Sequence, residues 1–133
     1  MTIELQETVA GLAPIVGSAI SAAATGSKIV YLSGQVGTLE DGSPAGETLE
    51  AQTAQAFRNI QVALAANGAT TSDIAKVTFY IVDWDMEKLG GLMAGAIEGL
   101  GDDLTVTATT LVGVQTLFEP GWLIEIDVTA VVD

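Results

Sequence analysis

The sequence contains no cysteine and no histidine. Without cysteine there is no disulfide framework and no thiolate nucleophile. Without histidine, the Ser-His and Cys-His catalytic pairs and the usual zinc sites are also excluded, and no metal site is expected. No glycine pattern matches a Walker loop or a dinucleotide-binding fingerprint. Any acid–base chemistry must therefore use Asp, Glu, Lys, Tyr or water.

The sequence also contains few basic residues. Four Lys and Arg residues stand against 17 acidic residues, and the formal net charge is −13. This charge disfavours binding to phosphate backbones and to anionic membranes, so neither nucleic acid nor membrane is expected as a partner. We interpret the acidity mainly as a feature that keeps the protein in solution.

Long apolar runs are also missing, since none approaches the ~18 residues that a membrane span requires. The first residues are acidic and lack the features of a signal peptide, so we expect a cytoplasmic protein. With 133 residues, 49% of them hydrophobic, the chain is long enough for a sizeable core. The sequence therefore predicts a single domain over residues 1–133.

Apolar periodicity and turn residues predict the secondary structure. We expect an arm or edge strand over residues 1–19, a hairpin formed by residues 20–24 and 28–32, and strands over 75–82, 105–114 and 122–132. Two helices are expected over 49–67 and 86–100, with Thr48 and Asp85 as their capping residues and Gly68 ending the first. This order is typical of an α+β domain with one sheet and two helices on one of its faces.

Two further expectations concern packing. The second helix contains Gly90, Gly91, Gly95 and Gly99, which we interpret as a marginal helix stabilised by its packing rather than as a site of close helix approach. The second face of the sheet is expected to carry apolar side chains without a covering layer, which predicts oligomerisation. The residues assigned to that face are Val82, Leu111, Leu123 and Val131.

One acidic residue interrupts the last predicted strand. Residues 122, 124, 126, 128 and 130 share one face of that strand by its period of two, and Glu125 lies on the other. A strand so rich in Ile and Val is expected to be partly covered on both faces, where a carboxylate is costly unless it has a partner or a function. Glu125 is therefore the strongest candidate for a catalytic residue.

Several segments together resemble the reactive-intermediate deaminase family, also called the RidA/YjgF family. They cover nearly the whole chain in order and spacing, and none is decisive alone. The matching residues are Tyr31–Gln35, Gln52-Thr53, Asn59-Ile60, 66–68, 73–78, Asp83, Leu123–Ile126 and Ala130.

The resemblance implies a chorismate-mutase-like α+β fold and a homotrimer in which three sheets form a barrel. A small-molecule cleft would then lie at each subunit interface. Family members hydrolyse reactive enamines and imines, such as 2-aminoacrylate, to keto acids and ammonia, and they use no cofactor. The family's catalytic carboxylate falls on Glu125, and its backbone contact on the Ser-Gly-Gln turn falls on Ser33 and Gly34.

The chain departs from the family at the arginine that grips the substrate carboxylate. Thr109 stands at that position, and it is grouped here with Leu111 on the same strand as a substrate-binding residue. Threonine offers one hydroxyl and no charge in place of a bidentate guanidinium. The family's tyrosine and asparagine are also absent, at about Ala19 or Ile20 and at about Gly91. We therefore expect 2-aminoacrylate and related α-imino acids to be poor substrates.

Two functional hypotheses follow. In the first, Glu125 activates water for attack on an enamine or imine that lacks the usual carboxylate. In the second, the chain is a catalytically inactive binding or interaction module on the same trimeric fold, and Glu125 is an interface carboxylate. Thr109 would then be an ordinary strand residue, and Ser33-Gly34 a strand-end bulge. An endoribonuclease, an activity also attached to this family, ranks below both because of the charge.

Overall fold

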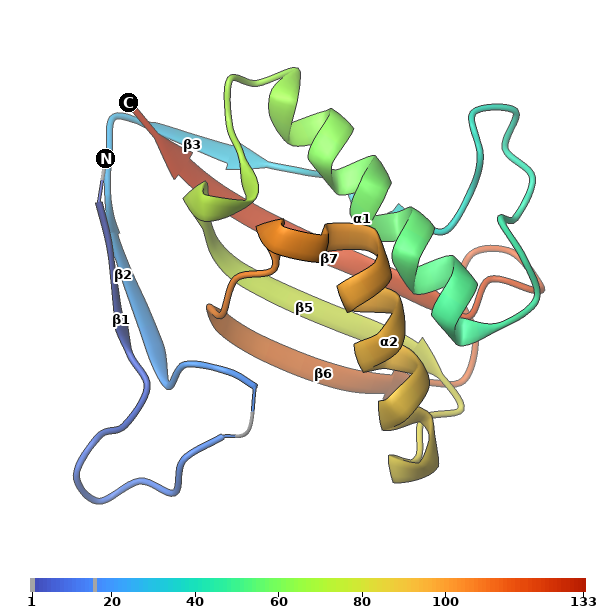
Figure 1. Cartoon of the computed structure of the whole chain (residues 1–133), viewed down its shortest axis with the longest axis horizontal. Coiled ribbons are helices and arrows are strands. Elements are labelled where there is room, and N and C mark those ends of the chain that lie inside the picture. The colour runs from blue at the N-terminus through green and yellow to red at the C-terminus, as the bar shows by residue number, and fades with distance from the viewer. Residues whose placement is uncertain (1, 16) are drawn as a thin grey trace.

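The computed structural model describes residues 2–15 and 17–133 and has an α+β fold. Met1 and Val16, which belong to the predicted amino-terminal arm, lie outside the described residues. Short 3₁₀ turns precede β5 and flank α2, at Thr71–Asp73, Met86–Lys88 and Gly101–Asp103. The main elements are β1 (Thr2–Gln6), β2 (Ser21–Thr25), β3 (Lys28–Tyr31), β4 (Gln35–Val36), α1 (Leu49–Ala65), β5 (Ile74–Val82), α2 (Leu89–Leu100), β6 (Ala108–Val114) and β7 (Ile124–Val132), as Figure 1 shows.

The main sheet is mixed and has the strand order β3-β7-β5-β6, with β4 also pairing with β7. Only β5 and β6 are parallel, and the stretch that joins them contains α2. A parallel pair needs such a crossover, whereas the antiparallel β7 can lie between β3 and β5. The long strands predicted for the second half of the chain are confirmed, with β6 and β7 beginning at Ala108 and Ile124.

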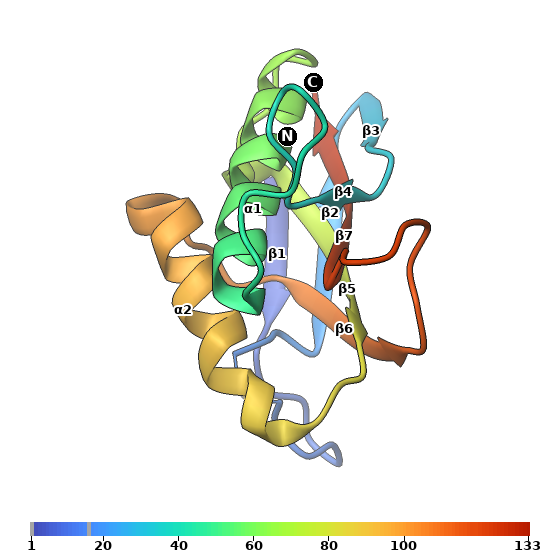
Figure 2. The same cartoon turned by 90° about the vertical axis from the view of Figure 1, so that its right-hand side faces the viewer.

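Both helices pack on the same face of this sheet, as expected (Figure 2). The apolar side of β7 lies beneath them: Ile124, Ile126, Val128 and Ala130 are all buried, which confirms the predicted alternation. Ile60 and Leu64 of α1 meet this row in the core and are fully buried. Truncating Ile60, Leu64, Ile124 or Ile126 to alanine would cost about 2–5 kcal/mol of folding free energy.

The amino-terminal hairpin differs from the expectation. Residues 21–25 pair antiparallel with β1 and not with β3, so β1 and β2 form a separate two-stranded sheet, on the left of Figure 1. An isolated bridge between Ala19 and Ala108 connects this segment to the edge of β6, and the Ser18 hydroxyl adds hydrogen bonds to Thr107 and Thr109. The predicted hairpin of 20–24 with 28–32 is wrong because β3 is taken up by β7, with Lys28 opposite Val132.

The two predicted caps are present. The Thr48 hydroxyl accepts a hydrogen bond from the Ala51 N–H at 3.1 Å and so caps α1. Gly68, just beyond the helix, has a positive φ of 72°, as expected for a left-handed terminating residue. Asp85 caps the 3₁₀ turn before α2 by accepting from the Glu87 N–H.

The glycines of α2 have a more specific role than we expected. A Cβ on Gly95 would lie 2.6 Å from the Glu50 carbonyl oxygen, and one on Gly99 would lie 2.6 Å from the Ala54 carbonyl oxygen. Both distances are shorter than real Cβ contacts, so α1 and α2 approach each other backbone to backbone at these two positions. The interpretation of the glycines as merely tolerated is therefore wrong for Gly95 and Gly99.

The uncovered face of the sheet is more polar than predicted. Leu111 packs against the core on the helix side, and Leu123 lines a small pocket together with Leu49 of α1. Val82 and Val131 lie on the uncovered face as predicted, because they alternate with the buried Ile81 and Ala130. The apolar side chains that this face does expose belong mainly to β3 and β6: Ile29 is 56% exposed, Tyr31 75% and Val112 38%. Glu125, Asp127, Thr78 and Lys76 occupy the centre of the same face.

Candidate functional site

Glu125 lies near the start of β7, on the uncovered face. Its neighbours across the sheet are Tyr80 on β5 and Val36 on β4. A Cβ built on Gly34 would come within 2.6 Å of both Cδ and Oε2 of Glu125. The carboxylate is thus in contact with the Gly34 backbone, which places two of the residues proposed from the sequence next to each other.

The Ser33-Gly34 segment lies where the pairing with β7 is irregular, between β3 and β4. Four residue steps separate Tyr31 from Gln35, whereas three steps separate their partners Thr129 and Ile126 on β7. The extra residue makes a bulge between β3 and β4. The strand-end bulge expected for Ser33-Gly34 is therefore present, and the Gly34 backbone within it contacts the Glu125 carboxylate.

The Glu125 carboxylate has no hydrogen bond or ion pair to residues 2–15 or 17–133 of its own chain. The nearest basic residue on its sheet face, Lys76, donates to the Thr110 hydroxyl at 2.8 Å. Arg58 pairs with Glu98, and Lys88 with Asp83. A half-buried carboxylate without an internal partner is available to a ligand or to another protein chain.

Thr109 and Leu111 lie on the opposite face of the sheet from Glu125. Thr109 is paired with Val77 of β5 and Leu111 with Phe79, whereas Glu125 is paired with Tyr80. Alternate residues of a strand point to opposite faces, so Thr109 and Leu111 face the helices and Glu125 faces away from them. One chain therefore cannot bring Glu125 and Thr109 to the same small molecule.

A partly enclosed cavity of about 100 Å³ lies on the Thr109 side, between α2, β5, β6 and the amino-terminal segment. None of the described residues that line it has a charged side chain, and Met93 and Leu104, which line it, are each partly exposed. Leu111 is not part of its lining. The lining consists of Gly17, Phe57, Thr71, Ile74, Val77, Phe79, Leu92, Met93, Ala96, Leu100, Leu104, Thr105, Thr107 and Thr109.

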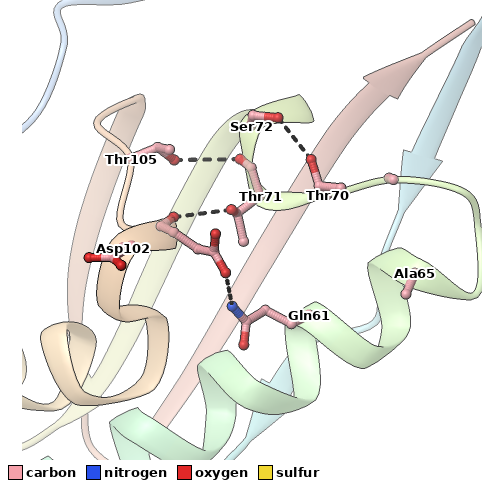
Figure 3. A pocket seen from close by; sticks show the side chains of 9 residues that line it. Gln61, Ala65, Thr70, Thr71, Ser72, Asp102 and Thr105 are labelled. Carbon is pink, nitrogen blue, oxygen red and sulfur yellow. Dashed lines mark hydrogen bonds between the residues drawn. The ribbon is translucent and has the colours of Figure 1, made fainter.

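A wider and more open depression of about 600 Å³ adjoins this cavity and shares Thr71 and Thr105 with it. Its polar groups largely bond to one another (Figure 3). Asp103 accepts a hydrogen bond from Gln61 on α1, and the Asp103 carbonyl accepts one from Thr71 at 3.0 Å. These contacts join α1 to the turn that follows α2, and that turn to the one that precedes β5, so the depression is better explained as a packing feature than as a reaction site.

Two polar residues of α1 support the Glu125 region, and the sequence identified them only through the family resemblance. Gln52 is 1% exposed; its amide nitrogen donates to the carbonyls of Gly46 and Gly121, and its oxygen accepts from the Leu123 N–H. Asn59 donates to the carbonyls of Val36 and Thr38. Both residues hold loops next to β4 and the start of β7, where Glu125 is located.

Comparison with known proteins agrees with this fold. The family model described as Endoribonuclease L-PSP matches residues 12–132. The chain belongs to this family, whose members include the Rid and YjgF proteins. The resemblance stated from the sequence is thereby confirmed.

Individual relatives share part or all of the chain. RutC family protein YjgH of Escherichia coli (strain K12) is 41% identical over 63 residues, which make up 47% of this chain and 47% of that protein. The Rid family protein YyfB of Yersinia pestis, described as of unknown function, has a TM-score of 0.86 at 27% identity, covering 98% of this chain and 99% of that one. Rv2704 of Mycobacterium tuberculosis, a YjgF family member, has a TM-score of 0.63 at 25% identity with the same coverage.

Neither α1 nor α2 combines the length and hydropathy needed to span a bilayer, and the other described residues form no longer helix.

Proposed function

We propose that residues 1–133 act as one domain that assembles into a homotrimer and hydrolyses enamines or imines lacking the carboxylate of an amino-acid-derived substrate. The observation that carries this proposal is the contact of Glu125 with the Gly34 backbone. The carboxylate is half-buried, without an internal partner among the described residues, and is held beside a strand bulge. Family membership supports a small molecule as its ligand.

The position of Glu125 and Thr109 on opposite faces of the sheet supports assembly into a homotrimer. A site that uses both residues requires the uncovered face of one copy and the cavity side of another. Cyclic assembly repeats one such heterologous contact around the ring, so a trimer would have three equivalent sites. The exposed Ile29, Tyr31 and Val112 on the Glu125 face give that contact an apolar component.

The chemistry requires one carboxylate and water. Glu125 accepts a proton from water while the hydroxyl oxygen bonds to the C=N carbon, and it then passes this proton to the nitrogen. In the resulting carbinolamine, Glu125 transfers the O–H proton to the nitrogen as the C–N bond breaks, which leaves a carbonyl group and releases ammonia. The balance is imine plus water to carbonyl compound plus ammonia. An enamine enters the same sequence after protonation at carbon.

The matching model's name refers to an endoribonuclease, but the charge of this chain argues against a phosphodiester substrate. Seventeen acidic residues face four basic ones. The described basic residues are also engaged elsewhere: Lys28 donates to the Asn67 carbonyl, and Lys76 bonds to Thr110. An RNA backbone would find few counter-charges on this surface.

A non-catalytic binding module is the second candidate. It is favoured by Thr109, which stands at the position where the family resemblance implies an arginine that binds the substrate carboxylate. The two candidates are separated by ammonia release from neutral imines, generated from aliphatic amines by a flavin amine oxidase. We expect the protein to accelerate release above the spontaneous rate and Glu125→Gln to abolish the acceleration while the assembly stays intact. Full activity of the Gln variant would remove Glu125 from the mechanism. Absence of acceleration over a broad imine panel would favour the binding module.

A further inference from the structure

The cavity beside Thr109 has an unusual polar lining. Its polar side chains are four threonines, at positions 71, 105, 107 and 109, and the remaining side chains are apolar. No Lys or Arg is available to an anion there. The chemistry of the cavity therefore depends on what the four hydroxyl groups have left to offer.

Each of these hydroxyl groups already donates its hydrogen to a backbone carbonyl. Thr109 donates to the Thr107 carbonyl at 3.1 Å, and the one Thr107 hydroxyl hydrogen is shared between the carbonyls of Ile74 and Ala75, at 3.2 and 3.0 Å. Thr105 donates to the Thr71 carbonyl at 3.4 Å, and Thr71 donates to the Asp103 carbonyl at 3.0 Å. A hydroxyl has one hydrogen to give, so these side chains retain only methyl groups and oxygen lone pairs.

We infer that this cavity binds the apolar part of a neutral ligand that carries a hydrogen-bond donor, and that it rejects carboxylates. A carboxylate is an acceptor only, and here it would lose its hydration without gaining a side-chain donor. An N–H or O–H group would meet the threonine oxygens, and the hydrocarbon part would meet Phe79, Leu92 and Ala96. The cavity volume of about 100 Å³ suits a branched aliphatic chain or a single ring.

This inference rests on the proposed function in taking the cavity as the substrate half of the shared site. It names the substrate class as a neutral imine of a branched or cyclic aliphatic carbonyl compound, with the imine N–H as the donor. It also gives Thr109 a positive role, because the residue lines a pocket whose described lining is uncharged.

A binding experiment on the intact protein tests the inference without requiring turnover. The probes are 3-methylbutan-1-ol and 3-methylbutanoate, which share a carbon skeleton and differ at the end group. We expect titration followed by ligand-observed NMR to show saturable binding of the alcohol and at least ~100-fold weaker binding of the carboxylate. Equal or tighter binding of the carboxylate would overturn the inference, and so would absence of saturable alcohol binding.

Variants place the binding in the cavity. Ala96→Leu fills the space and should abolish alcohol binding, whereas Ala94→Leu, on the same helix but outside the lining, should preserve it. Thr109→Val keeps the shape, removes one acceptor and should weaken alcohol binding roughly 3- to 10-fold. Unchanged binding in Ala96→Leu, with its fold verified by circular dichroism, would refute the site. If the alcohol binds as stated but no imine is hydrolysed, the proposed function fails and the cavity's ligand class stands.

Discussion

The carboxylate of Glu125 lies against the backbone of Gly34, so closely that a Cβ on Gly34 would be 2.6 Å from Oε2. Gly34 is not among the glycines with positive φ, so its importance is steric and not conformational. The atoms it would displace are at the far end of a flexible side chain. Glycine at this position therefore determines where the carboxylate is held.

Gly34→Ala should separate activity from stability. The new methyl group pushes the Glu125 carboxylate aside, and we expect ammonia release to fall at least ~10-fold because a misplaced base loses its geometry. The free energy of unfolding in urea should change by less than about 1 kcal/mol, since the side chain can move. Wild-type turnover in the Ala variant would show that the contact does not position the base.

The glycines of α2 give a second prediction: alanine should lower the stability of the protein at one position and raise it at another. Gly99→Ala should destabilise the protein by about 1–3 kcal/mol, because its methyl group would meet the Ala54 backbone. Gly90→Ala, with nothing within 4 Å of the added carbon, should stabilise it by about 0.5–1 kcal/mol through helix propensity. Urea unfolding of both variants checks the pair, and equal effects would contradict the backbone-to-backbone contact of α1 and α2.

Gln52→Leu should destabilise the protein by about 2–3 kcal/mol, because the Gly46 and Gly121 carbonyls and the Leu123 N–H lose their partner. Gln61→Leu is the matched control, since it removes one longer bond, of 3.2 Å, to the exposed Asp103 carboxylate. Its cost should stay below about 1 kcal/mol. Thermal unfolding of the two variants measures the difference, and similar values would argue against a structural role for Gln52.

Assembly through the uncovered sheet face predicts that Ile29→Asp dissociates the trimer. The charge would be buried against a neighbouring copy and left unpaired there. Val62→Asp places the same charge on α1, on a side chain that is 72% exposed, and should leave the trimer intact. Analytical ultracentrifugation distinguishes the variants. A monomeric wild-type protein, or a trimeric Ile29→Asp variant, would rule out this interface.

Local sequence signals predicted the longer elements well. The period-two burial of β7, the Thr48 cap and the helix that follows it depend on neighbouring residues, and all are confirmed. The error in the amino-terminal hairpin arose because Ala22 and Ala24 fit a strand without indicating its partner. Pairing is decided by long-range contacts such as Lys28 with Val132.

The candidate site shows the same limit. The sequence proposed Glu125, Gly34 and Thr109, and the first two lie together. The sequence did not indicate that Thr109 and Glu125 lie on opposite faces of the sheet. Their faces depend on the strand registers, in which Val77 of β5 is paired with Thr109 of β6. The hydrogen bonds of Thr71, Thr105 and Thr107 could likewise not be predicted, since each of these hydroxyl groups donates to the backbone of a residue that only the fold brings near.

The central claim, that Glu125 and the Thr109 cavity combine only between copies, is tested most directly with mixed trimers. Glu125→Gln and Ala96→Leu subunits, each inactive alone, are denatured together in equal amounts and refolded, and ammonia release from the imine of 3-methylbutanal is measured. Random mixing gives intact sites at interfaces where an Ala96→Leu subunit supplies Glu125 and a Glu125→Gln subunit supplies the cavity. We predict recovery of roughly a quarter of wild-type activity. Mixed trimers that form but remain inactive would contradict a site shared between subunits.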